Sequence, residues 1–160
     1  MGRVPVGAYC LCALLLLAAC ATTSLESQTK PQDPRQARIY FLRESSFMFS
    51  AAAPNVKVDG QQVGTVANGS YFFVDRPPGP HTVTLETPLV PGRFAANVTV
   101  RPGRAYYLKV SPRTEYFVAG VVAGAVGQVL DAVISENSGS YSLTPLDENA
   151  GIALLAQLKQ

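Results

Sequence analysis

The chain has 160 residues, a formal net charge of +2, three cysteines and one histidine. This length suits one domain plus a targeting segment, and so small a charge argues against a nucleic-acid partner. All three cysteines lie within the first 20 residues, so the rest of the chain offers no thiol for a disulfide, a nucleophile or a metal site. We therefore expect no cofactor and no metal.

Residues 1–19 have the layout of a secretory signal peptide. Arg3 is their only charge, and the apolar run that follows is too short to span a bilayer. The run ends in Leu17-Ala18-Ala19-Cys20, which resembles the lipobox of bacterial lipoproteins. The resemblance implies cleavage before Cys20 and acylation of that residue with palmitate-like chains, which anchor the protein in a membrane. Ala21 replaces the aspartate that would favour inner-membrane retention, so the expected location is the outer membrane, facing the periplasm.

Residues 20–36 are expected to form the lipidated cysteine and a disordered tether. The segment is rich in Thr, Ser, Gln and Pro, and only Leu25 offers apolar surface for burial. Such a composition cannot offset the entropy lost on ordering. A flexible tether of this length spans roughly 20–25 Å and would leave the orientation of the domain free.

Residues 37–160 are predicted to fold as one small antiparallel β-sandwich. Apolar residues alternate along short segments, and turn residues separate them, which is typical of β-hairpins. The structural turns are assigned to Asp59 with Gly60, to Gly69 and to Gly79, and His81 is interpreted as structural. The loop 44–54 carries Phe47, Met48 and Phe49, either laid on the core or exposed at a rim. The predicted strands cover 37–43, 56–58, 63–66, 71–74, 81–86, 94–101, 105–111 and 140–146.

The order of several segments resembles an uncharacterised family of bacterial lipoproteins. The segments are ARIYFLR, VKVDGQQVG, NGSYFFV, PPGPHTVTLE and AYYLKV, the last preceded by a Pro-Gly turn. The domain of that family looks like the PEGA type, a sandwich of transthyretin-like or immunoglobulin-like build. The resemblance covers 37 to about 159 and implies a fold and an envelope location. It implies no catalytic residue.

The apolar, glycine-rich segment 116–134 is predicted to form a helix. Its valines gather on one side and its glycines on the other at helical spacing, although each interior glycine costs about 1 kcal/mol relative to alanine. Three interpretations stay open: a cover for one side of the sandwich, close helix–helix packing through Gly120 and Gly124, or membrane contact. A short C-terminal helix is predicted over 150–158, with Ile152, Leu155 and Leu158 on one stripe.

The sequence favours a non-catalytic, lipid-anchored envelope protein that acts by binding or structural support. Its partners would be the membrane, through Cys20, and an envelope protein of unknown identity; the oligomeric state stays open. One alternative is an oligomerising or membrane-interacting lipoprotein that works through 116–134. Another is an enzyme acting on cell-wall glycan with Asp75, Glu86 or Glu115 as acids, although nothing in the sequence pairs these residues.

Overall fold

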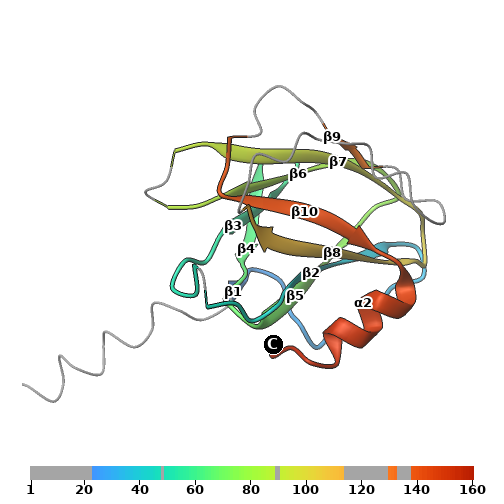
Figure 1. The fold of residues 1–160 in the computed structure, drawn as a ribbon. Helices are drawn as coiled ribbons and strands as arrows, with labels where there is room; N and C mark the ends of the chain where they lie inside the picture. The colour runs from blue at the N-terminus through green and yellow to red at the C-terminus, as the bar shows by residue number, and fades with distance from the viewer. Residues whose placement is uncertain (1–22, 48, 89–90, 114–129, 133–137) are drawn as a thin grey trace, which may run out of the picture.

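Two β-sheets and one helix make up the described part of the chain, which a computed structural model covers for residues 23–47, 49–88, 91–113, 130–132 and 138–160 (Figure 1). The six-stranded sheet has the order β1 (Thr23–Ser24), β4 (Gln61–Thr65), β3 (Asn55–Val58), β6 (Gly79–Glu86), β7 (Arg93–Val100) and β9 (Leu130–Ala132). The four-stranded sheet has the order β10 (Tyr141–Leu146), β8 (Ala105–Pro112), β2 (Ala37–Arg43) and β5 (Ser70–Arg76). The helix is α2 (Glu148–Leu155).

The two sheets share one hydrophobic core. Period-2 alternation sends every second side chain of a strand to the same face, so Ile39 and Phe41 of β2 meet Val56 and Val58 of β3 in a single buried cluster. Phe41 also contacts Phe72 of β5, with ring centroids 5.2 Å apart. The predictions of a mainly β chain and a short C-terminal helix are confirmed.

Strand pairing differs from the expected succession of antiparallel hairpins. Asp59 and Gly60, with φ of 52° and 79°, do form a hairpin turn between β3 and β4. The turns at Gly69 and Gly79 instead carry the chain from one sheet to the other, because β5 belongs to a different sheet from β4 and β6. In addition, β2 and β8 pair in parallel, so the four-stranded sheet is mixed. Turn residues fix where the chain reverses, but they do not fix which sheet receives the next strand.

Helix α2 covers the outer face of the four-stranded sheet. Leu154 packs there against Leu42 and Tyr107 in a second buried cluster. Gly151 lies directly over the Tyr107 ring, where an added Cβ would overlap ring atoms. Leu155 and Leu158 of the predicted stripe are partly buried against this cluster, but Ile152 is 50% exposed and Leu154 is buried in its place. The missing side chain at Gly151 lets the Leu154 side of the helix approach the sheet closely.

The glycine-rich segment 116–134 lies largely outside the described residues. Gly120 and Gly124 are among those not described. Residues Leu130–Ala132 form the strand β9, which pairs antiparallel with β7, so the helical prediction is wrong for these three residues. Pairing with β7 satisfies backbone groups that would otherwise be left on an open sheet edge. Among the described residues, none of the helical segments has the length and apolar character that a membrane crossing requires.

The strands define two ends of the molecule. The loop end, on the left of Figure 1, is where β2 finishes at Arg43, β3 begins at Asn55 and β4 finishes at Thr65. The turn end holds the Asp59–Gly60 turn and the Pro102–Gly103 turn. The connections from β2 to β3 and from β4 to β5 lie at the loop end, and those from β5 to β6 and from β7 to β8 lie at the turn end.

Candidate functional site

Residues 23–36, expected to be a disordered tether, lie along the domain. β1 pairs with β4 through Thr23↔Thr65, and the Leu25 amide donates to the Val63 carbonyl at 3.0 Å. The segment reaches the turn end, where the Gln36 carbonyl accepts from the Gly103 amide at 2.9 Å. Its contacts are mostly polar, and polar partners on a folded surface do not show in the composition of the segment itself.

Residues 23–36, called the docked segment below, cover the free edge of β5. The outward-facing amides of this edge strand need acceptors. The Phe73 amide donates to Gln28 Oε1 at 2.7 Å, and Gln28 Nε2 donates back to the Phe73 carbonyl at 2.9 Å. The Tyr71 amide donates to the Lys159 carbonyl at 2.9 Å, and the Asp75 amide reaches Glu26 Oε2 at 3.4 Å. Side chains and the C-terminus thus stand in for a neighbouring strand.

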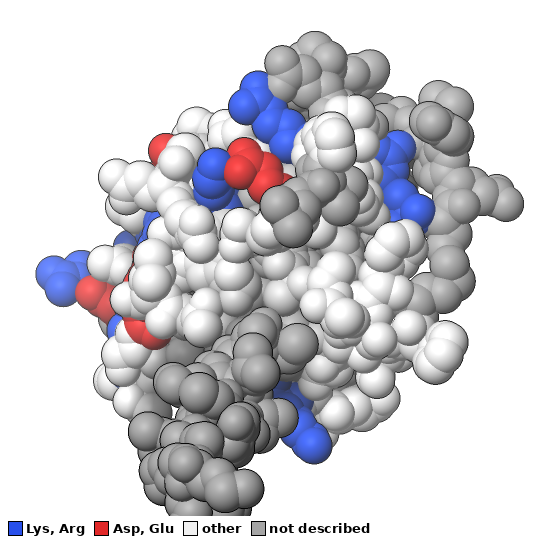
Figure 2. Space-filling view, turned by 90° about the vertical axis from the view of Figure 1, so that its left-hand side faces the viewer, with Lys and Arg blue, Asp and Glu red and all other residues white. Residues whose placement is uncertain are grey.

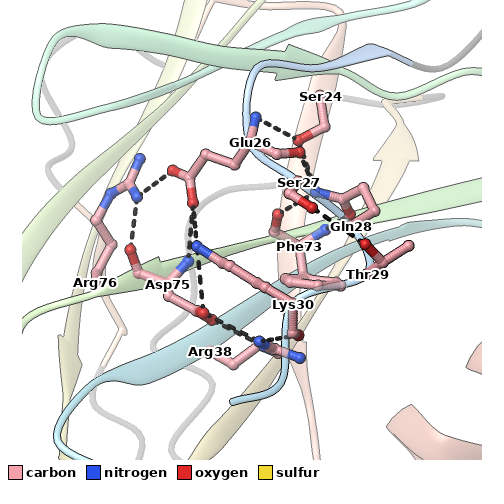
Figure 3. A network of polar contacts seen from close by, with 10 residues as sticks. All are labelled: Ser24, Glu26, Ser27, Gln28, Thr29, Lys30, Arg38, Phe73, Asp75 and Arg76. Atoms are coloured by element: carbon pink, nitrogen blue, oxygen red, sulfur yellow. Dashed lines mark hydrogen bonds and ion pairs between the residues drawn. The ribbon is translucent and has the colours of Figure 1, made fainter. Parts of the chain in front are cut away.

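A charged network fastens the same segment beside β2 and β5 (Figure 3). Arg38 of β2 binds Asp75 of β5 with two hydrogen bonds of 2.8 and 3.0 Å. Lys30 bridges Asp75 at 3.3 Å and Glu26 at 3.0 Å, and Glu26 binds Arg76 at 2.5 Å. The Arg38 side chain is 8% exposed and that of Asp75 is 2% exposed, so this pair forms the buried centre of the network.

Electrostatics keep the two acids of the network ionised. Burial alone would raise the pKa of Asp75, but hydrogen bonds from Arg38 and the charges of Arg38 and Lys30 outweigh it, so the pKa lies below its usual range. Glu26 follows the same pattern: burial opposes ionisation, while Arg76 and Lys30 lower its pKa. The Arg38 guanidinium also lies 3.8 Å from the centroid of the Phe73 ring, a cation–π contact.

A second unusual group, Arg43, supports the loop 44–54 at the loop end. Its side chain is fully buried, and its guanidinium donates to three backbone carbonyls: Phe49 at 2.7 Å, Val66 at 3.3 Å, and Ala52. Burial lowers the pKa of Arg43, yet arginine stays charged at neutral pH. The Arg43 Nε atom has no hydrogen-bond partner. This buried cation ties the backbone of Phe49 and Ala52 in the loop to that of Val66.

The loop presents aromatic side chains to solvent. Phe47 is 98% exposed and Phe49 is 46% exposed, while Phe49 also contacts the Tyr141 ring edge-on at 6.4 Å. The sequence left open whether these aromatics lie on the core or at a rim; the structure places Phe47 at a rim. Met48 lies outside the described residues.

The turn end holds the pair of Asp59 and His81. Asp59 Oδ2 lies 2.6 Å from His81 Nδ1, and Asp59 Oδ1 accepts from the Thr82 amide at 2.9 Å. The other ring nitrogen of His81 lies 2.8 Å from the Pro77 carbonyl oxygen. Both ring nitrogens and both carboxylate oxygens are therefore engaged in holding the turn. Burial alone would raise the pKa of Asp59, and the bonds from His81 and Thr82 outweigh it and lower that pKa.

The remaining candidate residues do not converge on one cleft. Asp75 belongs to the charged network, and Glu86 binds Lys57 at 2.6 Å on the other sheet. Cys20 and Glu115 lie outside the described residues. Within the described part of the chain, His, Cys, Asp and Glu side chains form no group of three or more that could hold a metal ion. Sequence reasoning missed Arg38 and Arg43, since a charged residue in a strand gives no signal of its partner.

Comparison with protein-family models places the chain in a family of unknown function, as the sequence predicted. A family model described as a protein of unknown function, DUF2846, matches residues 33–125. The match spans β2 to β8 and so includes Arg38, Arg43 and Asp75. No curated protein and no solved structure matches the chain. Because the model covers more than half of the 160 residues, the chain belongs to the DUF2846 family.

Proposed function

We propose that the protein is a lipid-anchored, non-catalytic module of the cell envelope that acts by binding or by structural support. The anchor is an acylated Cys20, and the domain faces the periplasm from the outer membrane. In this proposal the two sheets are a sandwich of the PEGA-like type, related in build to immunoglobulin-like or transthyretin-like domains.

The position of β1 carries this proposal. Only Ala21 and Thr22 separate the lipobox cysteine from the first docked residue, Thr23. Fully extended residues span at most about 3.6 Å each, so Cys20 lies within about 11 Å of Thr23. An anchor at Cys20 would hold the domain against the bilayer, and the docked segment 23–36 would limit its freedom to tumble. A rigid mount suits a module that presents a surface to a partner.

The engagement of the acidic residues supports a non-catalytic role. Catalytic pairs of carboxylates share a cleft and leave one group free to exchange a proton. Here Asp75 is bound by Arg38, Glu86 is bound by Lys57, and Asp59 holds a turn. Each of these acids is committed to a structural contact.

Acyl labelling in cells tests the anchor. Wild-type protein should incorporate radioactive palmitate and fractionate with the outer membrane, whereas Cys20→Ala should do neither. Cys12→Ala is the matched control, since it removes a thiol from the signal peptide and should leave labelling intact. Equal labelling of wild type and Cys20→Ala, or no labelling of either, would refute the proposal.

Saturable capture tests the binding role. The purified acylated protein should retain a discrete envelope protein from detergent extracts, and an excess of unlabelled protein should compete for it. Retention that does not saturate would count against a binding module.

A further inference from the structure

We infer that the loop 44–54 is a membrane-contacting device that inserts Phe47 into the lipid headgroup region beside the anchor. This inference rests on the proposed acylation of Cys20. It adds an orientation: the loop end faces the bilayer, and the turn end faces away from it.

The first argument is the place where β1 begins. Thr23 pairs with Thr65, and Thr65 pairs with Asn55, the residue that follows the loop. Neighbouring strands lie about 4.8 Å apart, so Thr23 is about 10 Å from Asn55. The loop and the start of β1 therefore share the loop end, and a lipid on Cys20 would bring the bilayer surface to this end.

The second argument is the chemistry of the loop. Residues 45–54 contain no charged side chain, and they include Phe47, Met48 and Phe49. Figure 2 views the loop end from the front: most of the visible described surface there is uncharged, with Lys, Arg, Asp and Glu side chains at several separate places on it. The Phe47 side chain is 98% exposed, so its apolar surface remains in contact with water. Moving this aromatic ring into the membrane interface would remove that surface from water, which is favourable in free energy.

The third argument is that the loop is held in shape. Arg43 binds the carbonyls of Phe49 and Ala52, and Asn68 binds Ser46 through both its amide oxygen, at 2.9 Å, and its amide nitrogen, at 3.0 Å. Phe49 has a φ of 58°, an uncommon value for a residue other than glycine. These contacts hold the backbone of Ser46 and Phe49, on either side of Phe47, and leave the Phe47 side chain exposed.

A protein partner is the competing occupant of this aromatic loop. The membrane is favoured because covalent geometry limits the distance between the anchor and Thr23 to about 11 Å, which leaves little room for a protein between the loop and the lipid. Glu44, the one charged residue of the loop, binds Lys109 at 2.6 Å, and such a pair suits the headgroup region.

Site-directed fluorescence on the acylated full-length protein tests the inference. Once the signal peptide is removed and Cys20 is acylated, Phe47→Cys supplies the single free thiol for an environment-sensitive dye. Arg104→Cys is the matched control, because Arg104 is exposed at the turn end and β8 separates it from the loop end. Both proteins are reconstituted in vesicles of phosphatidylethanolamine and phosphatidylglycerol that carry a nitroxide in the headgroup region.

We expect a blue-shifted emission and strong nitroxide quenching at position 47, and neither effect at position 104. Unquenched dye at position 47 in protein whose acylation is verified by mass spectrometry would overturn the inference and leave the proposed function standing. Absence of acylation would overturn both. A blue shift at position 47 that requires an added envelope extract would assign the loop to a protein partner and overturn membrane insertion. Circular dichroism of both variants checks that the fold is kept.

Discussion

Replacing Asp75 with asparagine should remove a large part of the stability of the domain. The Asp75 carboxylate is the acceptor for Arg38 and Lys30, and the Arg38–Asp75 pair is almost completely buried. Asparagine keeps the shape of the side chain but removes its charge. The Arg38 guanidinium would then be left buried without a counter-ion, which is the costly outcome for a broken buried ion pair.

The structure sets the size of this effect. Removing one partner of a buried pair costs about 3–5 kcal/mol. Lys30 is 36% exposed and can return to water, so we expect the lower end, about 3 kcal/mol. For a domain of this size, that loss corresponds to a Tm about 10 °C lower. Changing both partners to apolar residues, Asp75→Leu with Arg38→Met, should recover most of the loss because no charge is left unpaired.

Urea unfolding followed by circular dichroism measures the change. Asp33→Asn is the matched control, since its partner Arg35 is 87% exposed and solvent screens the pair. The control should unfold at the same urea concentration as the wild type. If Asp75→Asn unfolds together with Asp33→Asn, the buried-pair reasoning is refuted, and Arg38 must find another acceptor when Asp75 loses its charge.

Three further predictions concern the pH dependence of stability, the packing of α2 on the sheet and the hydrogen bonds at the β5 edge. Because the pKa of Asp75 is lower in the folded chain, its contribution to the free energy of unfolding is complete above the ordinary pKa of about 4 and is lost as the pH falls through the folded pKa. Urea unfolding at a series of pH values should therefore show the stabilities of wild type and Asp75→Asn converging in acid. Gly151→Ala should cost about 1–3 kcal/mol by pushing α2 off the sheet, and unchanged thermal stability would contradict this. Gln28→Ala should speed hydrogen exchange at the Phe73 amide and spare the Tyr71 amide, which a different segment covers; equal changes at both would point to general loosening.

Local patterns predicted most strands but not their partners. The alternation in ARIYFLR predicted the bounds of β2 as 37–43. Asp59 and Gly60 correctly marked the hairpin turn between β3 and β4. The parallel pairing of β2 with β8 could not be predicted, because it depends on packing between residues far apart in the sequence. The buried face of the C-terminal helix was missed for a related reason, since Gly151 has no apolar side chain yet occupies a buried position.

The charged network was beyond the reach of sequence patterns. Residues 23–36 contain Leu25 as their one large apolar side chain, and disorder was the natural prediction from composition. What orders them is the set of matching groups on β2 and β5, above all Arg38 and Asp75, together with the open edge that Gln28 fills. Such matches are properties of two surfaces, and a linear pattern describes only one of them.

The central place of β2 in its sheet bears on how the chain reaches its native state. Its two neighbouring strands, β5 and β8, come much later in the sequence: Ile39 pairs with Val74 on one side and with Tyr106 on the other. Topologies dominated by such distant pairings fold in milliseconds to seconds rather than microseconds. Until β8 is in place, one edge of β2 is open to another copy of the chain, so the newly made protein is most prone to aggregate in that interval.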